Sequence, residues 1–375
     1  MANAPSSLLK VWKMMEVDLA KEYGIPPANA EMSGALQEYL GRGGKYLRPA
    51  LTFVTTEAYQ LDMLEKALLP IMRVQNYDHN FFLIHDDVED GSMLRRGKPT
   101  LHVSFGMPKA INYGDYLRSL ADKELLKYRD VDPALYGTLS SARTEMMETT
   151  SRGQDLEFVM RENPLAEATE QGVLEILRNK TAHYTAFTPI RYGTIFAGKE
   201  YDALSIKENL MGIGVAFQVI DDTLDLLAEK EEENAPANLV SQKFGKDWLG
   251  DLEEVKRTYP LVKLIEAVSP SERELVFDSL DIYGKMPRLV AKKNAILMSQ
   301  VGTSRRDLAG IEKQIDDIKL EILGLVKDHK IIELSQEFAK DLYDSNIGAI
   351  DERLPDTKGR KKVDELLYYA IGRLF

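Results

Sequence analysis

Two short stretches of this 375-residue sequence repeat one arrangement of carboxylates. The stretches FFLIHDDVED and VIDDTLD each place an Asp-Asp-x-x-Asp pattern directly after an apolar run, and the aspartates are Asp86, Asp87, Asp90, Asp221, Asp222 and Asp225. On a helix, the first and last aspartate of each pattern lie one turn apart on the same face. Carboxylates at this spacing repel one another unless a cation lies between them. Oxygen ligands of this kind suit Mg²⁺, which keeps coordination positions open for substrate phosphates.

A single copy of this pattern has a simpler interpretation, because a solvated helix end in an acidic protein also carries aspartates. Two copies that each follow a hydrophobic helix are harder to explain as surface charge. Six facing carboxylates would require several divalent ions and an anionic ligand. A diphosphate meets this requirement, since its oxygens can bridge several Mg²⁺ ions. The sequence contains no HExxH, GxSxG, GxxxxGK[ST] or EF-hand pattern that would indicate another chemistry.

An anionic ligand also requires cations, and the sequence supplies them at several places. The candidates are Lys45 and Arg48 in GRGGKYLRP, Arg95 and Arg96 in RRGKP, Lys180 beside Thr181, Lys246 and Lys256. The glycines before Lys45 allow the backbone to approach an anion closely, and the planar arginine side chains suit phosphate oxygens. Each cation alone is explained equally well by a salt bridge. Together with the aspartates, they indicate two phosphate-bearing substrates.

Composition limits the class of protein. The chain is 44% hydrophobic and 29% charged, which is enough apolar residues for a sizeable core. Its net charge of −12 argues against broad nucleic-acid binding, so any basic site must be local. The absence of Cys excludes disulfides and thiolate sites. The N-terminal residues lack a signal-peptide pattern, and no apolar run reaches the ~18 residues of a membrane span, so we expect a cytoplasmic protein.

The elements that must position these residues are helices. Apolar residues recur at three- and four-residue spacing along most of the chain, and alternating strand patterns are almost absent. We therefore predict an all-α fold, a single large helical bundle with a central cavity, as one domain over residues 1–375. Two segments are expected at the periphery: an acidic loop at 229–243, and a charge-alternating helix at 300–330 that forms an exposed hairpin arm.

Over about residues 40–260, the chain resembles the trans-polyprenyl diphosphate synthases, with motifs in the order of that family. GGKYLRP resembles the family's GGKxxRP, DDVED its first aspartate-rich motif and DDTLD its second. The resemblance implies the isoprenoid synthase type of bundle and a homodimer. It also implies Mg²⁺, about three ions per site, on the aspartates of the two motifs, with Asp86, Asp90 and Asp221 as principal ligands.

The resemblance further implies a division of the polar residues between two substrates. Isopentenyl diphosphate would be held by Lys45, Arg48, His79 and Arg96. The allylic diphosphate would be held by Arg95, Lys180, Thr181, Gln218, Lys246 and Lys256. Among these, Lys180, Thr181 and Gln218 would act during catalysis. The implied reaction ionises the allylic diphosphate, joins the resulting carbocation to isopentenyl diphosphate and then releases a proton.

The chain departs from the family pattern at several positions. Leu249 and Val255 stand where the family usually has glycines, and Glu157 stands where an Asp is common. The interval between Asp221 and Lys246 is longer than usual because of the 229–243 segment. These departures make the assignment of Lys246 the least secure of the lysines in this region.

Product length is the property that Phe81 and Phe82 would determine. Phe82 precedes Asp86 by one helical turn, about 5–6 Å along the axis, so it would lie below the metal site. Two aromatic side chains there would form a floor that stops elongation early. The resemblance agrees, since paired aromatics before the first motif are typical of members that stop at fifteen carbons. We therefore predict farnesyl diphosphate as the main product and geranylgeranyl diphosphate as the next. The alternative is that both rings only pack between helices.

Two other functions share parts of this pattern. A class I terpene cyclase would have the helical fold and the first acidic motif, but it would not need GGKYLRP for a second diphosphate. A non-catalytic subunit of a heteromeric prenyl synthase would be expected to lose aspartates or basic ligands, which this chain keeps. Both comparisons favour a short-chain prenyltransferase.

Overall fold

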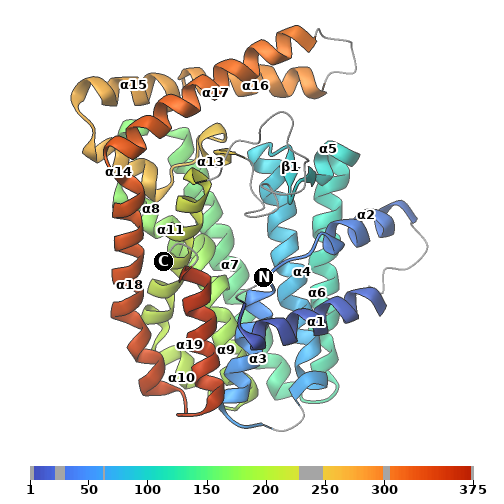
Figure 1. Ribbon diagram of the computed structural model, residues 1–375. Helices are drawn as coiled ribbons and strands as arrows, with labels where there is room; N and C mark the ends of the chain where they lie inside the picture. The colour runs from blue at the N-terminus through green and yellow to red at the C-terminus, as the bar shows by residue number, and fades with distance from the viewer. Residues whose placement is uncertain (1–3, 22–29, 62–63, 228–247, 299–304, 373–375) are drawn as a thin grey trace.

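The structure is a computed structural model that describes residues 4–21, 30–61, 64–227, 248–298 and 305–372. Nearly all regular structure in these ranges is helical (Figure 1). The described strands, β1 (Leu94–Arg95) and β2 (Lys98–Pro99), form one short antiparallel ribbon. The prediction of an all-α fold is therefore confirmed. The acidic loop predicted at 229–243 lies outside the described residues.

The helices fall into three groups along the chain. The first group is α1 (Ser6–Lys21), α2 (Ala30–Gly41), α3 (Leu47–Ala58), α4 (Leu64–Asp90), α5 (Leu101–Phe105), α6 (Met107–Arg129) and α7 (Pro133–Glu162). The second group is η1 (Leu165–Glu167), α8 (Glu170–Ile176), the π-helical η2 (Leu177–Phe187), α9 (Thr188–Phe196), α10 (Glu200–Ser205) and α11 (Lys207–Leu226). The third group is α13 (Gly250–Glu253), α14 (Tyr259–Ala267), α15 (Pro270–Leu280), α16 (Lys285–Met298), α17 (Arg305–Asp328), α18 (Ile331–Arg353) and α19 (Lys358–Ile371).

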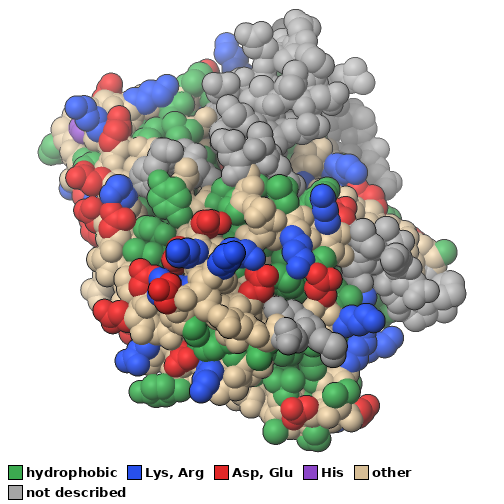
Figure 2. Space-filling view, turned by 60° about the horizontal axis from the view of Figure 1, so that its bottom comes forward, with side chains coloured by type: hydrophobic (Ala, Val, Ile, Leu, Met, Phe, Trp, Pro, Cys, Tyr) green, Lys and Arg blue, Asp and Glu red, His purple; other side chains and the backbone are tan. Residues whose placement is uncertain are grey.

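Helices α4, α6, α7, α11 and α18 stand roughly parallel and form a bundle (Figure 1). Helix α4 packs against α3 and α6, while α11 packs against η2 and α18. Their facing sides bury a large apolar core that includes Tyr39, Phe53 and Tyr192. No helix in the described ranges combines the length and the apolar character that crossing a membrane requires. On the face shown in Figure 2, Lys and Arg side chains are interspersed with Asp and Glu.

A second apolar core joins α13, α14, α15 and α17, which lie at one end of the bundle (Figure 1). Helix α17 packs against α16, as expected for a hairpin arm, but one of its faces is not exposed. Ile315, Ile318 and Ile322 of α17 are buried in the same core as Leu252 of α13 and Leu264 of α14. The expectation of an exposed arm is therefore wrong for one face of α17, because this face covers the second apolar core.

The π-helical segment η2 lies closely between two helices, and glycines make this possible. A Cβ atom on Gly153 of α7 would lie 2.1 Å from the backbone nitrogen of Lys180. A Cβ atom on Gly214 of α11 would lie 2.5 Å from the Cα atom of Ala182. No real side chain fits at these distances, so both helices contact the backbone of η2 directly. This packing fixes the position of Lys180, and π-helical turns are frequent at functional sites.

We predict that Gly153→Ala displaces η2 and destabilises the fold. Its added methyl group overlaps backbone atoms that cannot rotate away, and overpacking of this kind costs about 1–3 kcal/mol. Gly137→Ala in the same helix is the matched control, because its Cβ meets nothing within 4 Å. That control should be neutral or stabilising by about 0.5–1 kcal/mol, since alanine favours helix. Thermal unfolding of both variants measures the difference, and equal melting temperatures would contradict the prediction.

Candidate active site

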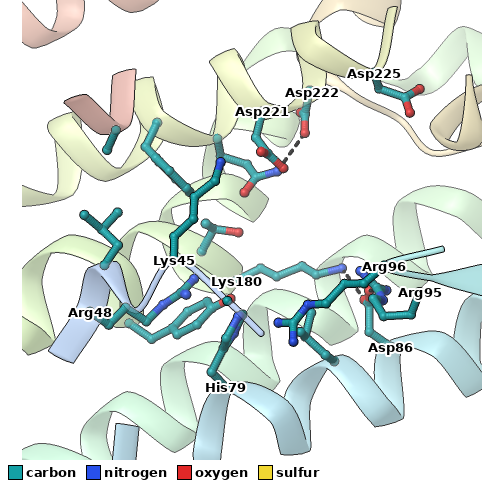
Figure 3. A pocket seen from close by; sticks show the side chains of 18 of the residues that line it. Lys45, Arg48, His79, Asp86, Arg95, Arg96, Lys180, Asp221, Asp222 and Asp225 are labelled. Carbon is teal, nitrogen blue, oxygen red and sulfur yellow. Dashed lines mark hydrogen bonds and ion pairs between the residues drawn. The ribbon is translucent and has the colours of Figure 1, made fainter. Parts of the chain in front are cut away.

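A polar cavity of about 430 Å³ lies inside the bundle (Figure 3). Its walls come from the 43–48 loop between α2 and α3, the inner face of α4, η2, α11 and the 250–258 segment. The structure thus contains the central cavity that the sequence predicted. The predicted site residues that line it are Lys45, Arg48, His79, Asp86, Arg95, Arg96, Lys180, Thr181, Gln218, Asp221, Asp222, Asp225 and Lys256.

The two acidic motifs face each other across this cavity. Asp86 comes from the last turns of α4, and Asp221, Asp222 and Asp225 come from the last turns of α11 (Figure 3). Gln218, one turn before Asp222, donates a hydrogen bond of 2.7 Å to its Oδ1 atom. The carboxylate of Asp225 accepts the backbone N–H groups of Gly250 and Asp251, each at 3.1 Å. The second motif therefore also anchors the 250–258 segment.

The helical geometry of α4 places the first two aspartates of the first motif in different surroundings. Asp86 lines the cavity, whereas Asp87 is fully buried and accepts hydrogen bonds from Tyr39 and from Arg95. The Arg95 guanidinium lies 2.5 Å from Asp87 and 3.6 Å from Asp86. Burial raises the pKa of Asp87 to about 6, although Arg95 opposes the rise. A metal-binding role for Asp87 would require this pair to open and stays a prediction.

Asp90 is also held by cations of the chain itself. Its side chain is completely buried, and it receives Arg161 Nη1 at 2.5 Å and Lys256 Nζ at 2.7 Å. Lys256 also lies 2.8 Å from Glu254. Burial alone would lower the pKa of Lys256, but the charges of Glu254 and Asp90 hold this pKa well above its ordinary value. Sequence reasoning missed Arg161, which lies far from Asp90 in the sequence. Metal binding by Asp90 likewise stays a prediction that requires both ion pairs to exchange.

Lys180 binds two carboxylates, one on α4 and one on α7. Its Nζ atom lies 3.0 Å from Asp86 and 2.9 Å from Glu157. Glu157 thus occupies the position where an Asp is usual, and its longer side chain reaches Lys180. Burial alone would raise the pKa of Asp86, but Lys180, Lys256 and Arg95 together hold it well below its ordinary value. Asp86 is therefore ionised at neutral pH.

The opposite side of the cavity carries basic groups. Arg48 donates to Thr185 at 2.8 Å, and its guanidinium lies 4.2 Å from the centre of the Tyr184 ring (Figure 3). Within the described residues, Arg48 Nε and His79 Nδ1 are buried atoms that make no hydrogen bond. Burial, with Arg48 and Arg96 nearby, lowers the pKa of His79 well below its ordinary value. Buried polar atoms left without a partner are costly, so this side fits an anionic ligand.

The predicted chain-length residues stand behind the cavity wall. Neither Phe81 nor Phe82 lines the cavity. The Phe82 ring packs edge-on against Tyr184, 5.4 Å between ring centres, and Phe81 packs on Phe82 and His85. Tyr184, one turn after Lys180, does line the cavity. Sequence reasoning missed this residue, although its spacing from Lys180 was a signal. Lys246 lies outside the described residues.

The donor set of this cavity suits a divalent cation held jointly with an anion. Among the described residues, no three acidic side chains converge closely enough to form a complete metal site. Carboxylates instead line opposite walls, from Asp86 on α4 and from Asp221 and Asp222 on α11. Carboxylate oxygens are the ligands that Mg²⁺ prefers, and it commonly completes its coordination with substrate phosphate oxygens. The residues present therefore fit a magnesium–diphosphate ligand.

Known proteins resemble this chain in both sequence and fold. A geranylgeranyl diphosphate synthase of Saccharolobus solfataricus is 29% identical over 64% of this chain and 68% of its own. A short chain isoprenyl diphosphate synthase of Methanocaldococcus jannaschii is 31% identical over 67% of this chain and 71% of its own. In fold, a geranylgeranyl pyrophosphate synthase of Corynebacterium glutamicum, solved with isoprenyl diphosphate and magnesium, superposes with a TM-score of 0.73 at 21% identity, covering 98% of this chain and 96% of its own.

The sequence model of the polyprenyl synthetase family matches residues 29–298. This match spans most of the chain and includes the GGKYLRP loop, both acidic motifs and the 250–258 segment. The acidic and basic walls of the cavity thus lie within the matched region. The chain belongs to the polyprenyl synthetase family, and it is a prenyltransferase.

Proposed function

We propose that this protein is a short-chain trans-prenyl diphosphate synthase. It condenses isopentenyl diphosphate with an allylic diphosphate, such as dimethylallyl or geranyl diphosphate, and lengthens the allylic chain by one five-carbon unit. One observation carries the proposal: a single cavity is lined both by facing carboxylates of α4 and α11 and by a separate set of buried basic groups. One site can therefore bind two diphosphates, one near the carboxylates and one near the basic groups.

The allylic diphosphate would lie between the acidic walls. Asp86, Asp221 and Asp222 would hold Mg²⁺ there, about three ions per site as the family resemblance suggests. When bound, Mg²⁺ would take up negative charge on the diphosphate and so favour its departure. Lys180 and Arg95, which are already fixed beside Asp86, would turn toward the departing oxygens and stabilise their charge.

Isopentenyl diphosphate would lie against the basic side. Arg48 and His79 would donate hydrogen bonds from the buried atoms that have no partner among the described residues, and Lys45 and Arg96 would add charge. Its double bond then faces the carbon from which the allylic diphosphate departs. The carbon–oxygen bond breaks, the new carbon–carbon bond forms, and the adjacent proton leaves to the released diphosphate.

The allylic cation must be protected until it reacts. Thr181 and Gln218 line the cavity and present oriented dipoles toward it, and the surrounding helices limit the access of water. The chain-length limit would lie beyond these residues, at Tyr184 with Phe82 behind it. The named relatives favour geranylgeranyl diphosphate, and the aromatic pair favours farnesyl diphosphate. We propose geranylgeranyl diphosphate as the better supported end point, with farnesyl diphosphate as the alternative.

The rival functions lack a comparable observation. A class I terpene cyclase uses one diphosphate, which leaves the basic side of the cavity without a ligand. A non-catalytic subunit has no need for acidic residues on both walls. A homodimeric assembly and a cytoplasmic location remain proposals from the family resemblance.

Removing one carboxylate from each wall tests the reaction. We expect Asp86→Asn and Asp221→Asn each to lower turnover of isopentenyl and geranyl diphosphates by about a hundredfold or more, since charge stabilisation in the transition state is lost. Glu65→Gln on α4 is the matched control, because Glu65 is exposed, pairs with Lys10 and does not line the cavity. Mass spectrometry of products with and without EDTA gives the measurement. A hydrocarbon product from the unmodified protein would instead support a cyclase.

Product length tests the aromatic wall. The double variant Phe81→Ala/Phe82→Ala should make longer products than the unmodified protein, because Tyr184 loses the ring that supports it. The single variant Phe81→Ala should lengthen the products less than Phe82→Ala does, because only the Phe82 ring of this pair packs against Tyr184. Product distributions measured with farnesyl diphosphate as primer provide the comparison. An unchanged distribution in the double variant would eliminate this explanation of chain length.

A further inference from the structure

The 248–258 segment forms one wall of the cavity and carries unusual backbone geometry. It contributes Asp251, Glu254 and Lys256 to the lining. Leu249 and Val255 within it have φ angles of 49° and 56°, in the left-handed region. Glycine adopts this region freely, whereas a β-branched residue there is a conformational outlier. The family's usual glycines would meet this requirement without strain, so this chain must hold the segment by other contacts.

Lys319 of α17 makes one of these contacts. Its side chain is 4% exposed, and its Nζ atom donates to the carbonyl oxygen of Trp248 at 2.9 Å. The same atom lies 2.6 Å from Glu253 and 5.3 Å from the centre of the Trp248 ring. Lys293 of α16 also binds Glu253. The ammonium group of Lys319 therefore binds the carbonyl group directly before the left-handed Leu249. It also binds the side chain of Glu253, the last residue of α13.

Arg257 makes the corresponding contact at the other end of the segment. It is buried, and its Nη1 atom donates to the carbonyl oxygens of Val255 at 3.0 Å and Leu280 at 3.2 Å. The first of these carbonyls belongs to the second left-handed residue. A buried cation thus binds a backbone carbonyl at each strained position: the carbonyl of Trp248, directly before Leu249, and the carbonyl of Val255 itself. Each contact also connects the segment to the second apolar core, through α17 or through α15.

We propose that Lys319 is a positioning residue for the allylic-diphosphate side of the active site. By fixing Trp248 and Glu253, it sets the backbone course of the segment that carries Lys256, and Lys256 binds Asp90 of the first motif. This inference rests on the proposed function for its catalytic consequence. The structural part, the dependence of the segment on α17, stands apart from the reaction.

Steady-state kinetics test the catalytic consequence. Lys319→Met keeps the length of the side chain and removes its donor, so we expect the KM for geranyl diphosphate to rise about tenfold or more. The KM for isopentenyl diphosphate should stay within about twofold, because the basic side of the cavity does not involve this segment. Lys313→Met is the matched control, since Lys313 is an exposed residue of the same helix. A loss of turnover with both KM values unchanged would indicate a merely structural role and overturn the proposal.

Tryptophan fluorescence tests the structural part without any substrate. The chain has two tryptophans, so Trp12→Phe leaves Trp248 as the single reporter. In that background, Lys319→Met should shift the emission of Trp248 and increase its quenching by acrylamide, whereas Lys313→Met should change neither. Identical spectra and quenching for the two variants would overturn the proposal. If the unmodified protein fails to elongate any primer, the proposed function falls, and these spectra still decide the role of Lys319.

Discussion

The active site depends on charge balance in a largely buried cavity. Carboxylates from α4 and α11 face one space, and a buried ion costs several kcal/mol unless it is paired. The chain itself supplies partners: Lys180 for Asp86, and Arg95 for Asp87. Under the proposed function, these cations are among those that would contact a diphosphate. Ligand binding would then exchange partners among existing charges and bring few new charges into the protein.

The two sides of the cavity reach this balance differently. On the acidic side, Asp86 and Asp90 are already bound to cations, and Asp225 is bound to backbone N–H groups. On the basic side, Arg48 and His79 hold buried nitrogen atoms without a hydrogen bond in the described part of the chain. Under the proposed function, a diphosphate alone would satisfy the basic side, whereas the acidic side would accept one only together with metal ions. This difference would let one cavity distinguish two ligands that share the same charged group.

The helical fold and the positions of the motifs were predictable because apolar periodicity and paired aspartates are local features. The different surroundings of Asp86 and Asp87 were not predictable, since consecutive helical residues point about 100° apart and only packing decides which one faces a cavity. Asp90 is bound by Arg161, a long-range partner with no local signal. The burial of α17 did have a signal, because Ile315, Ile318 and Ile322 follow helical spacing. The alternating charges around them concealed that apolar face.

The left-handed residues at 249 and 255 carry a consequence for how such a chain changes over time. A glycine meets the backbone requirement at its own position, whereas Leu249 depends on a lysine of a helix far along the sequence and Val255 depends on Arg257. Substitutions at these positions should then be interdependent: a relative that retains both glycines is free to lose the buried lysine, and a relative without them is not. The segment and α17 would thus form one evolutionary unit, although residues 259–304 separate them in the sequence.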